Sequence, residues 1–466
     1  MKISAVKNVI FNWIGMIAAM IYAFFMTPLI VHGLGDTYYG IWNLIMSCIG
    51  YMAVMDFGIQ SSINRYVAKY KGLGDKQGVS NIYSNAMAVY LCIGLITVIL
   101  GFVVALNLEK IFQINPTDVP LARKVMLLMV IYTAVEFPCN VFGALIYAYQ
   151  RFAALNIITS GMLVIQAMLV WFVLEYNAGL WFFALATIVC GLTKYLIQYI
   201  YTHQLISELS FRLNLISRET IVQMLTFSGI TFLAIIASYV IFRTDYIVIG
   251  MFLSPNAVTI YAIGFMLSDY TAQIVGKMCN TFTPIFSEYE ARGEQQELHS
   301  LLINSSRFSS LIGIPIGLAV IVIGEEFITL WMGKGYEGAY LIMVVMMVSR
   351  MAGFPTASMY SMLYGIGKHH IILYTGIAEA VTNLALSLIL VRRYGILGVA
   401  VGTMIPMVFV NMIFPLVVSR SVGFDLWKWL KAGALYPGMF CLVFYITIHF
   451  TCRWFNLVSW KNLLLQ

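Results

Sequence analysis

Nine charged residues lie inside long apolar stretches of the chain, and residues of these types can bind charged ligands. A charge at the centre of a bilayer costs about 2.5–3.5 kcal/mol on insertion scales, so it normally faces a water-filled cavity or an ion-pair partner. The nine are the cations Lys194, Arg243, Lys277 and Arg350 and the carboxylates Asp56, Glu136, Asp245, Asp269 and Glu379. We expect the cations to hold an anionic substrate, because guanidinium geometry suits phosphate or pyrophosphate. We expect the carboxylates to line a cavity or to bind a coupling proton or Na⁺.

Uncharged polar residues accompany these charges at three- or four-residue spacing, which places them on one face of a helix. They are Asn8 and Asn12 on the first apolar stretch, Gln60 and Asn64 after Asp56, and Gln273 and Asn280 after Asp269. A structural interpretation stays open, in which charges near the end of a stretch reach the interface and the others form interhelical pairs. The pattern predicts a polar cavity lined by the first, second, seventh and eighth stretches, with no metal site and no organic cofactor.

The composition indicates which elements must position these residues. Of the 466 residues, 61% are hydrophobic and only 10% are charged, against about 25% charged in soluble domains. The mean hydropathy of +0.87 excludes a water-soluble enzyme. Because the apolar runs are long and continuous, not the alternating ten-residue segments of an outer-membrane barrel, we predict an all-α, multi-pass integral membrane protein.

The apolar runs predict thirteen membrane-spanning helices. The first run has no charge from Asn8 to Gly35; it exceeds the ~30 Å hydrocarbon core and is longer than the apolar region of a cleavable signal, so we expect it to be retained. The predicted spans are residues 8–31, 38–66, 81–106, 123–148, 152–174, 179–202, 220–250, 257–287, 305–330, 338–364, 371–391, 396–419 and 431–450.

Charges and loop lengths predict the orientation and the class of protein. With the N-terminus in the cytoplasm, more than half of the 27 Lys and Arg residues fall on the cytoplasmic side, as the positive-inside rule favours. The net charge of +7 reflects this orientation, and we expect no nucleic-acid partner. The predicted loops are too short for a soluble catalytic domain, which favours a transporter over an enzyme. The cytoplasmic stretches Ser207 to Glu219 and Ser287 to Ser300 are expected to form helix extensions or surface helices.

The two halves of the chain are similar to each other at a shift of about 216 to 222 residues. The aligned segments are Tyr39–Ile41 with Tyr261–Ile263, Tyr70–Gln77 with Tyr289–Gln296, Tyr149–Arg151 with Ile366–Lys368, and Gly179 with Gly395. Because each repeat holds six helices, an even number, both enter the membrane from the same side, which predicts parallel repeats related by an axis along the membrane normal. The predicted domains are a six-helix bundle at 1–202, a cytoplasmic linker at 203–219, a six-helix bundle at 220–420 and an accessory helix and tail at 421–466.

Several short motifs resemble those of Wzx-type polysaccharide flippases, including those that carry O-antigen. In the first half they are Lys7-Asn8, Pro28-Leu29, Gly33-Leu34-Gly35, Tyr39-Gly40-Ile41, Asp56-Phe57-Gly58-Ile59 and Arg65-Tyr66-Val67-Ala68. In the second half they are Asp245-Tyr246-Ile247-Val248-Ile249-Gly250, Tyr261-Ala262-Ile263 and Pro284-Ile285-Phe286-Ser287. These flippases belong to the multidrug/oligosaccharidyl-lipid/polysaccharide exporter superfamily, and the resemblance covers at least residues 5–420.

The resemblance implies two six-helix bundles that face each other in a V around a central cavity. It implies a bacterial cytoplasmic-membrane protein that flips an undecaprenyl-pyrophosphate-linked oligosaccharide from the cytoplasmic to the outer leaflet by alternating access, for O-antigen, capsule or exopolysaccharide synthesis. The expected partners are this lipid-linked substrate, membrane lipids, a polysaccharide polymerase and a chain-length regulator, with a monomer as the transport unit.

Three other functions remain open. A cation-coupled multidrug antiporter of the same superfamily is disfavoured, because the first helix carries no carboxylate between Asn8 and Val31 and intramembrane cations suit cationic drugs poorly. A membrane glycosyltransferase or polymerase is disfavoured, because no loop is large enough for its catalytic groups. A lipid II flippase is excluded by no local feature, although the motifs match the polysaccharide branch better.

Overall fold

The computed structural model describes residues 2–454, and every regular element over that range is a helix. Side chains are described throughout this range except at 2–12, 14, 227, 228, 230, 231, 234, 444 and 448–454. Contacts divide the chain into two compact units. The first unit comprises Met1–Thr259 with Val391–Ile396, and the second comprises Ile260–Leu390 and the chain from Leu397 onward.

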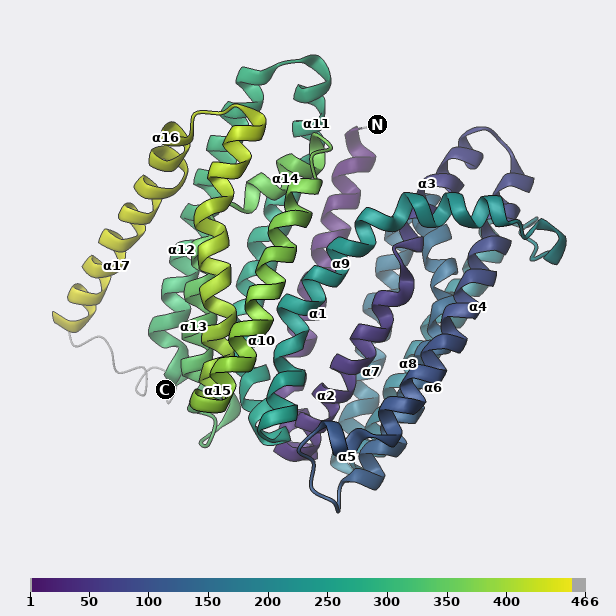
Figure 1. The fold of residues 1–466 in the computed structure, drawn as a ribbon, viewed down its shortest axis with the longest axis horizontal. Helices are drawn as coiled ribbons and strands as arrows, with labels where there is room; N and C mark the ends of the chain where they lie inside the picture. Colours follow the sequence, from purple (N-terminus) through teal and green to yellow (C-terminus); the bar gives the residue numbers. More distant parts are fainter. Residues whose placement is uncertain (1, 455–466) are drawn as a thin grey trace. The chain divides into compact units, whose positions relative to one another are not determined.

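The first unit is built from nine α-helices and two short 3-10 helices, labelled in Figure 1 where there is room. They are α1 (Lys2–Leu34), α2 (Asp36–Ala53), η1 (Val54–Asp56), α3 (Ile59–Gly72), α4 (Lys76–Leu106), α5 (Leu108–Ile111), α6 (Val119–Ala148), α7 (Phe152–Glu175), α8 (Gly179–Leu205), η2 (Leu213–Leu215) and α9 (Arg218–Phe252). Side-chain caps start two of the long helices: Asp75 accepts a hydrogen bond from the Gly78 N–H at the start of α4 (2.8 Å), and Ser217 accepts one from the Thr220 N–H at the start of α9 (3.2 Å). The helix α9 packs on α2, α3 and α4, so its contacts group it with the first unit.

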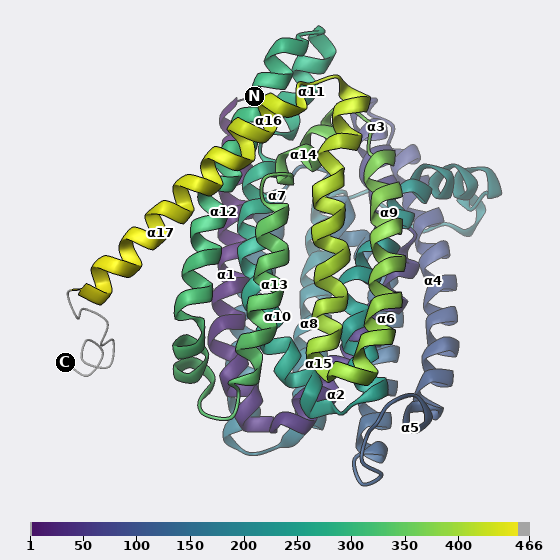
Figure 2. The ribbon, with the colours of Figure 1, turned by 60° about the vertical axis from the view of Figure 1, so that its left-hand side comes forward.

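The second unit contains the remaining helices. They are α10 (Pro255–Asn280), whose first turn belongs to the first unit, α11 (Thr283–Arg292), α12 (Gln295–Met332), α13 (Gly338–Gly353), α14 (Ala357–Gly365), α15 (His370–Val422), α16 (Leu426–Trp429), the π-helix η3 (Leu430–Leu435) and α17 (Tyr436–Trp454). Figures 1 and 2 show α17 beside α12, with which it makes contact.

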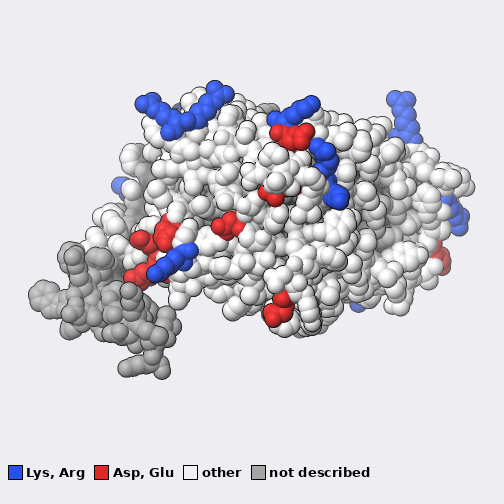
Figure 3. Space-filling view, turned by 90° about the horizontal axis from the view of Figure 1, so that it is seen from below, with Lys and Arg blue, Asp and Glu red and all other residues white. Residues whose placement is uncertain are grey.

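Many of these helices have the length and composition of membrane spans. Within the described residues, eleven helices qualify, or up to twelve if the bent pair α13 and α14 forms one span. All thirteen predicted spans lie on helices of the structure. The structure needs fewer helices than spans because α15 has 53 residues and holds both 371–391 and 396–419. Charged side chains form only small, separate groups on the face shown in Figure 3. The predicted fold class is confirmed: the protein is an all-α integral membrane protein.

Several predicted spans are interrupted where the prediction had continuous helix. The second span breaks between η1 and α3 because Phe57 (φ 51°) and Gly58 (φ 70°) adopt left-handed conformations. The eighth breaks between α10 and α11, just before Pro284, and the tenth bends by 49° between α13 and α14, where Pro355 lies. Proline removes a backbone donor and clashes with the preceding turn, which explains both sites. Conversely, only Gly395 (φ 58°) interrupts α15.

The stretch between α8 and α9 also differs from its prediction. From Ser207 to Ser217 the chain forms only the short helix η2, and α9 begins at Arg218. Side chains of α4 form hydrogen bonds with backbone N–H and C=O groups of this stretch, so these groups do not need helical partners. The stretch from Ser287 to Ser300 agrees with its prediction, because α11 extends to Arg292 and α12 begins at Gln295.

Backbone conformations support the internal repeat. Left-handed residues recur at aligned positions of the two halves, at Gly74 and Gly293 (φ 71° and 70°), at Gln150 and Gly367 (φ 59° and 74°), and at Gly179 and Gly395 (φ 76° and 58°). Each pair lies in a segment that the sequence aligned, at shifts of 216 to 219 residues. The similarity of the halves is therefore structural as well as sequential.

Each unit has its own apolar core. In the first unit, buried side chains of α3, α4 and α6 pack together around Ile63, Tyr90 and Leu145. In the second, α11, α12, α14, α15 and α16 meet around Phe286 and Phe414. Because apolar burial gives a helix in lipid little net driving force, close packing and interhelical hydrogen bonds must hold these helices together.

Candidate functional site

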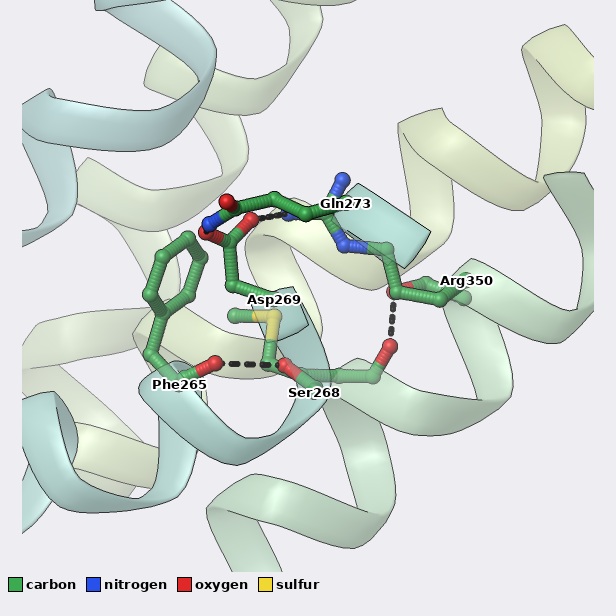
Figure 4. A network of polar contacts seen from close by, with 7 residues as sticks. Phe265, Ser268, Asp269, Gln273 and Arg350 are labelled. Atoms are coloured by element: carbon green, nitrogen blue, oxygen red, sulfur yellow. Dashed lines mark hydrogen bonds and ion pairs between the residues drawn. The ribbon is translucent and has the colours of Figure 1, made fainter. Parts of the chain in front are cut away.

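The most buried group of charges in the second unit joins α10 and α13. The Arg350 guanidinium lies 2.8 Å from an Asp269 carboxylate oxygen, and Gln273 donates a hydrogen bond of 2.8 Å to the other oxygen. The side chains of Arg350 and Asp269 are 10% and 32% exposed. Figure 4 shows these three side chains, with the ring of Phe265 beside them. Both Asp269 oxygens thus have a donor, which is what a carboxylate needs at membrane depth.

The helices bring this pair together through a close approach. A Cβ atom on Gly264 of α10 would lie 2.5 Å from the Ala339 carbonyl oxygen of α13, so only glycine permits this distance between the backbones. At about 1.5 Å per residue, Asp269 lies about 21 Å along α10 from Pro255, and Arg350 lies about 18 Å along α13 from Gly338. Both depths fall inside a hydrocarbon core of about 30 Å.

Arg350 also interacts with groups besides Asp269. Its guanidinium carbon lies 5.8 Å from the centre of the Phe265 ring, within the range of a cation–π contact. Glu379 of α15 is 7% exposed and interacts electrostatically with Arg350. One guanidinium therefore lies in the field of two carboxylates from different helices, an arrangement in which gain or loss of one proton or cation changes the local balance of charge.

The rest of the α10 stripe is exposed. Gln273, Lys277 and Asn280 are all exposed, and Ser361 of α14 donates a hydrogen bond of 3.2 Å to Asn280. Lys277 lies about 33 Å along α10 from Pro255, which places it near the far edge of a 30 Å core. Within the described residues Lys277 makes no ion pair.

A second charged group lies in the first unit, between α6 and α8. The Tyr195 hydroxyl lies 2.5 Å from a Glu136 carboxylate oxygen and 3.1 Å from the Asn140 side-chain oxygen. The Lys194 ammonium lies 4.1 Å from the centre of the Tyr195 ring and interacts electrostatically with Glu136. The structure thus brings together Glu136 and Lys194, which the sequence identified separately.

Asp56 has a different environment, at the break between η1 and α3. The Tyr90 hydroxyl of α4 donates a hydrogen bond to its carboxylate, and so do the backbone N–H groups of Gly58 and Gln60. These bonds satisfy the first turn of α3. Gln60 is exposed, and the Asn64 side-chain oxygen is buried without a hydrogen-bond partner among the described residues.

Arg243 and Asp245 lie on opposite sides of α9. Asp245 is fully buried and interacts electrostatically with Tyr51 of α2, whose hydroxyl is hydrogen-bonded to Thr244. Arg243 is exposed and forms no ion pair with any described residue. It lies about 14 Å along α9 from Phe252, near the middle of a hydrocarbon core.

The structure therefore assembles some predicted residues and separates others. It joins Asp269, Gln273, Arg350 and Glu379 in one group, and Glu136 and Lys194 in another. The side chains of Asn8 and Asn12 lie outside the described residues. Sequence reasoning missed Tyr90 and Tyr195, whose hydroxyls bond to Asp56 and Glu136, and Asn140, whose side-chain oxygen lies beside the Tyr195 hydroxyl. Tyrosine and asparagine are common at interfaces, so only a helix-pairing pattern would reveal these partners. No group of three or more His, Cys, Asp or Glu in the described part of the chain is arranged to hold a metal ion.

Known proteins share both sequence and fold with this chain. The family described as "Polysaccharide biosynthesis protein" matches residues 5–290, more than half of the chain. A Shigella flexneri protein named "Putative O-antigen transporter" is 20% identical over 405 residues, which cover 86% of this chain and 94% of that protein.

Two solved structures have the same fold with a TM-score of 0.74 and 14% identity. One is an inward-facing multidrug resistance MATE transporter of the MOP superfamily, matched over 86% of this chain and 94% of that chain. The other is the lipid II flippase MurJ in an inward closed conformation, matched over 96% and 93%. The expected resemblance is confirmed: the fold is that of MOP superfamily transporters, and the chain belongs to the polysaccharide biosynthesis protein family of transporters and flippases, not to an enzyme family.

Proposed function

We propose that the protein flips an undecaprenyl-pyrophosphate-linked oligosaccharide from the cytoplasmic to the outer leaflet by alternating access. The observation that carries this proposal is Arg243, an exposed guanidinium at membrane depth with no ion-pair partner among the described residues. Such a cation is stable only beside water or an anion. A pyrophosphate provides two adjacent anionic groups that a guanidinium binds in a bidentate manner.

The charges at membrane depth favour an anionic substrate over a cationic drug. Arg243 has no ion-pair partner in the part of the chain that the structure describes, and Lys277 adds a second exposed cation nearer the interface. The fold is equally similar to a multidrug transporter and to a lipid II flippase, so fold alone separates none of these functions. The name of the Shigella flexneri relative refers to O-antigen transport, which agrees with a glycan on an anionic lipid carrier.

The buried carboxylates supply the remaining parts of the proposal. Asp269 and Glu379 flank Arg350 and serve as the binding groups for a coupling H⁺ or Na⁺, with no organic cofactor. Asp56 and Glu136 have hydrogen-bonded, structural surroundings. The protein resides in the bacterial cytoplasmic membrane with its N-terminus in the cytoplasm, acts as a monomer, and delivers the lipid-linked glycan to a polymerase and its chain-length regulator.

The test is reconstitution of the full-length protein in vesicles with undecaprenyl-pyrophosphate-linked oligosaccharide. Flipping is measured as the fraction of glycan that a membrane-impermeant lectin reaches with time. Arg243→Gln is expected to lower the rate about ten- to a hundredfold, because a charge-assisted hydrogen bond contributes about 1.5–3 kcal/mol. Arg243→Lys keeps the positive charge but loses the planar guanidinium that binds a phosphate in a bidentate manner, so it should retain part of the activity.

The matched control is Arg420→Gln, which removes an exposed arginine at the end of α15. This variant should flip the substrate at the wild-type rate. Wild-type flipping by Arg243→Gln would contradict the assignment of this residue to the substrate. Vesicles that accumulate a cationic dye but never flip the glycan would replace the proposal with a multidrug antiporter.

A further inference from the structure

A polar pocket lies in the first unit, away from the charged groups described above. It has a volume of about 510 Å³ and is formed by the first turns of α4 and the stretch that joins α8 to α9. Its lining includes Lys76 and Ser80 of α4 and Glu208, Arg212 and Leu215 of the joining stretch. In Figure 1 the joining stretch is the loop near the right-hand edge that precedes α9.

Two fully buried side chains of α4 hold the wall of the pocket in place. The Ser84 hydroxyl accepts a hydrogen bond of 3.1 Å from the Arg212 N–H. The Asn85 side chain accepts a bond of 2.9 Å from the Ser217 N–H and donates one of 2.9 Å to the Leu215 carbonyl. Because these bonds fix the backbone on both sides of η2, the pocket is a built feature of the fold and not a gap beside a loose loop.

The pocket carries one uncompensated positive charge. The Lys76 ammonium lies 2.5 Å from a Glu208 carboxylate oxygen, so these two charges balance each other. Arg212 is exposed and forms no ion pair with any residue that the structure describes. The net charge of the lining is therefore +1, and the guanidinium is the group left to bind an anion.

A serine on the pocket wall adds a second group that could bind a ligand. Ser80 is only 6% exposed, lines the pocket and makes no hydrogen bond to another described residue. Ser80 therefore has an unused donor in the same pocket as the Arg212 guanidinium, and an anionic oxygen is the acceptor that both can share.

The pocket lies at the ends of membrane-length helices, where we expect lipid headgroups. It is formed at the start of α4, the end of α8 and the stretch before α9, all at the ends of membrane-length helices. Beside it, Phe211 and Leu213 of the joining stretch are exposed, and Leu213 is 74% exposed. Exposed apolar side chains beside a basic group are typical of segments that contact the membrane interface.

We infer that this pocket binds a phosphoryl group, with Arg212 and the Ser80 hydroxyl as its ligands. The group can come from the headgroup of an anionic phospholipid, whose acyl chains would lie beside Phe211 and Leu213, or from free phosphate. Glu208 limits the affinity, because it neutralises Lys76 and repels an anion. Its removal should therefore strengthen binding, which is a result that general damage to the fold would not give.

The test uses the full-length protein in detergent, stripped of lipid. Native mass spectrometry measures retention of added phosphatidylglycerol, and calorimetric titration measures binding of inorganic phosphate. Arg212→Gln should lower the affinity for the phosphoryl ligand about ten- to a hundredfold, because a charge-assisted hydrogen bond is lost. Ser80→Ala should lower it about tenfold, because a neutral hydrogen bond is lost. Glu208→Gln should raise affinity severalfold. The matched control is Arg218→Gln, since Arg218 is exposed nearby but does not line the pocket.

The two measurements separate the sources of the group. Phosphatidylglycerol retention that is strongest in Glu208→Gln and weakest in Arg212→Gln, without phosphate binding, supports a lipid headgroup. Phosphate binding in the same order supports the site with a soluble ligand. Equal losses in Arg212→Gln and Arg218→Gln, or weaker binding in Glu208→Gln, would overturn the inference. Unfolding midpoints of all variants identify any variant that fails to fold. If Arg212→Gln fails to fold, Ser80→Ala, which removes only one oxygen atom, still tests the site.

Discussion

Removal of the Arg350 guanidinium should destabilise the second unit far more than removal of a surface ion pair. The Arg350–Asp269 contact of 2.8 Å corresponds to a gross attraction of about 6 kcal/mol at an effective dielectric constant of 20. Arg350→Gln leaves Asp269 and the buried Glu379 without their cation, and breaking a buried pair costs about 3–5 kcal/mol. Because Asp269 is 32% exposed and keeps its bond from Gln273, we expect a loss of about 2–3 kcal/mol.

A double-mutant cycle isolates the pair. Arg350→Gln, Asp269→Asn and the double variant are unfolded in mixed detergent micelles, and tryptophan fluorescence gives the free energy of unfolding. The coupling energy should be about 1.5–3 kcal/mol. The control cycle uses Glu288 and Arg292, an i,i+4 pair whose side chains are 54% and 57% exposed, for which we expect less than about 0.5 kcal/mol. Equal coupling energies in the two cycles would refute the reasoning.

Two further predictions concern other parts of the second unit. Trp429→Phe removes the indole donor to the buried Ser306 hydroxyl (2.9 Å) and should lower the free energy of unfolding by about 1–2 kcal/mol, whereas Trp427→Phe, at a side chain 68% exposed, should leave it unchanged. The pKa of Glu337 is lowered because its own backbone N–H and that of Gly335 donate to its carboxylate. This carboxylate therefore stabilises its loop above the unfolded pKa of about 4.3, and the effect is lost as the pH falls through the lower folded value. A carbon-13 NMR titration, assigned with Glu337→Gln, should give a midpoint below 4.3, and a midpoint at or above that value would contradict the hydrogen bonds.

The helices could be predicted from sequence because lipid imposes a simple rule. Every backbone group must be bonded within the bilayer, so a long apolar run becomes a helix. The breaks were harder to predict. Gly58, Pro284 and Pro355 stood in the sequence as breakers, but apolar runs continue across them, and only the structure shows that the helices stop there.

The charged groups could be predicted as a set but not as pairs. Helical spacing identified Asp269 and Gln273 as neighbours on one face. Nothing in that spacing connects Asp269 to Arg350, 81 residues away, because the pairing of helices depends on the close approach at Gly264. The hydrogen bond of Tyr195 to Glu136 was hidden for the same reason.

The position of α9 shows another limit of the sequence. The repeat assigns residues 220–250 to the second half, while the contacts of α9 lie with α2, α3 and α4. The repeat shows which segments of the chain correspond to each other, whereas the packing of α9 depends on which helix surfaces fit together. The domain boundaries at 202 and 219 rest on the repeat alone and stay predictions.

The central claim is that the protein moves a glycan on an anionic lipid carrier across the membrane. The most direct measurement is made in cells that lack the protein, where undecaprenyl-pyrophosphate-linked glycans are quantified separately in each leaflet. The account predicts that a complete oligosaccharide repeat accumulates on the cytoplasmic side, that one surface polysaccharide is lost, and that the wild-type gene restores both while Arg243→Gln does not. Unchanged lipid-linked glycans and surface polysaccharides, together with raised sensitivity to cationic dyes, would contradict it.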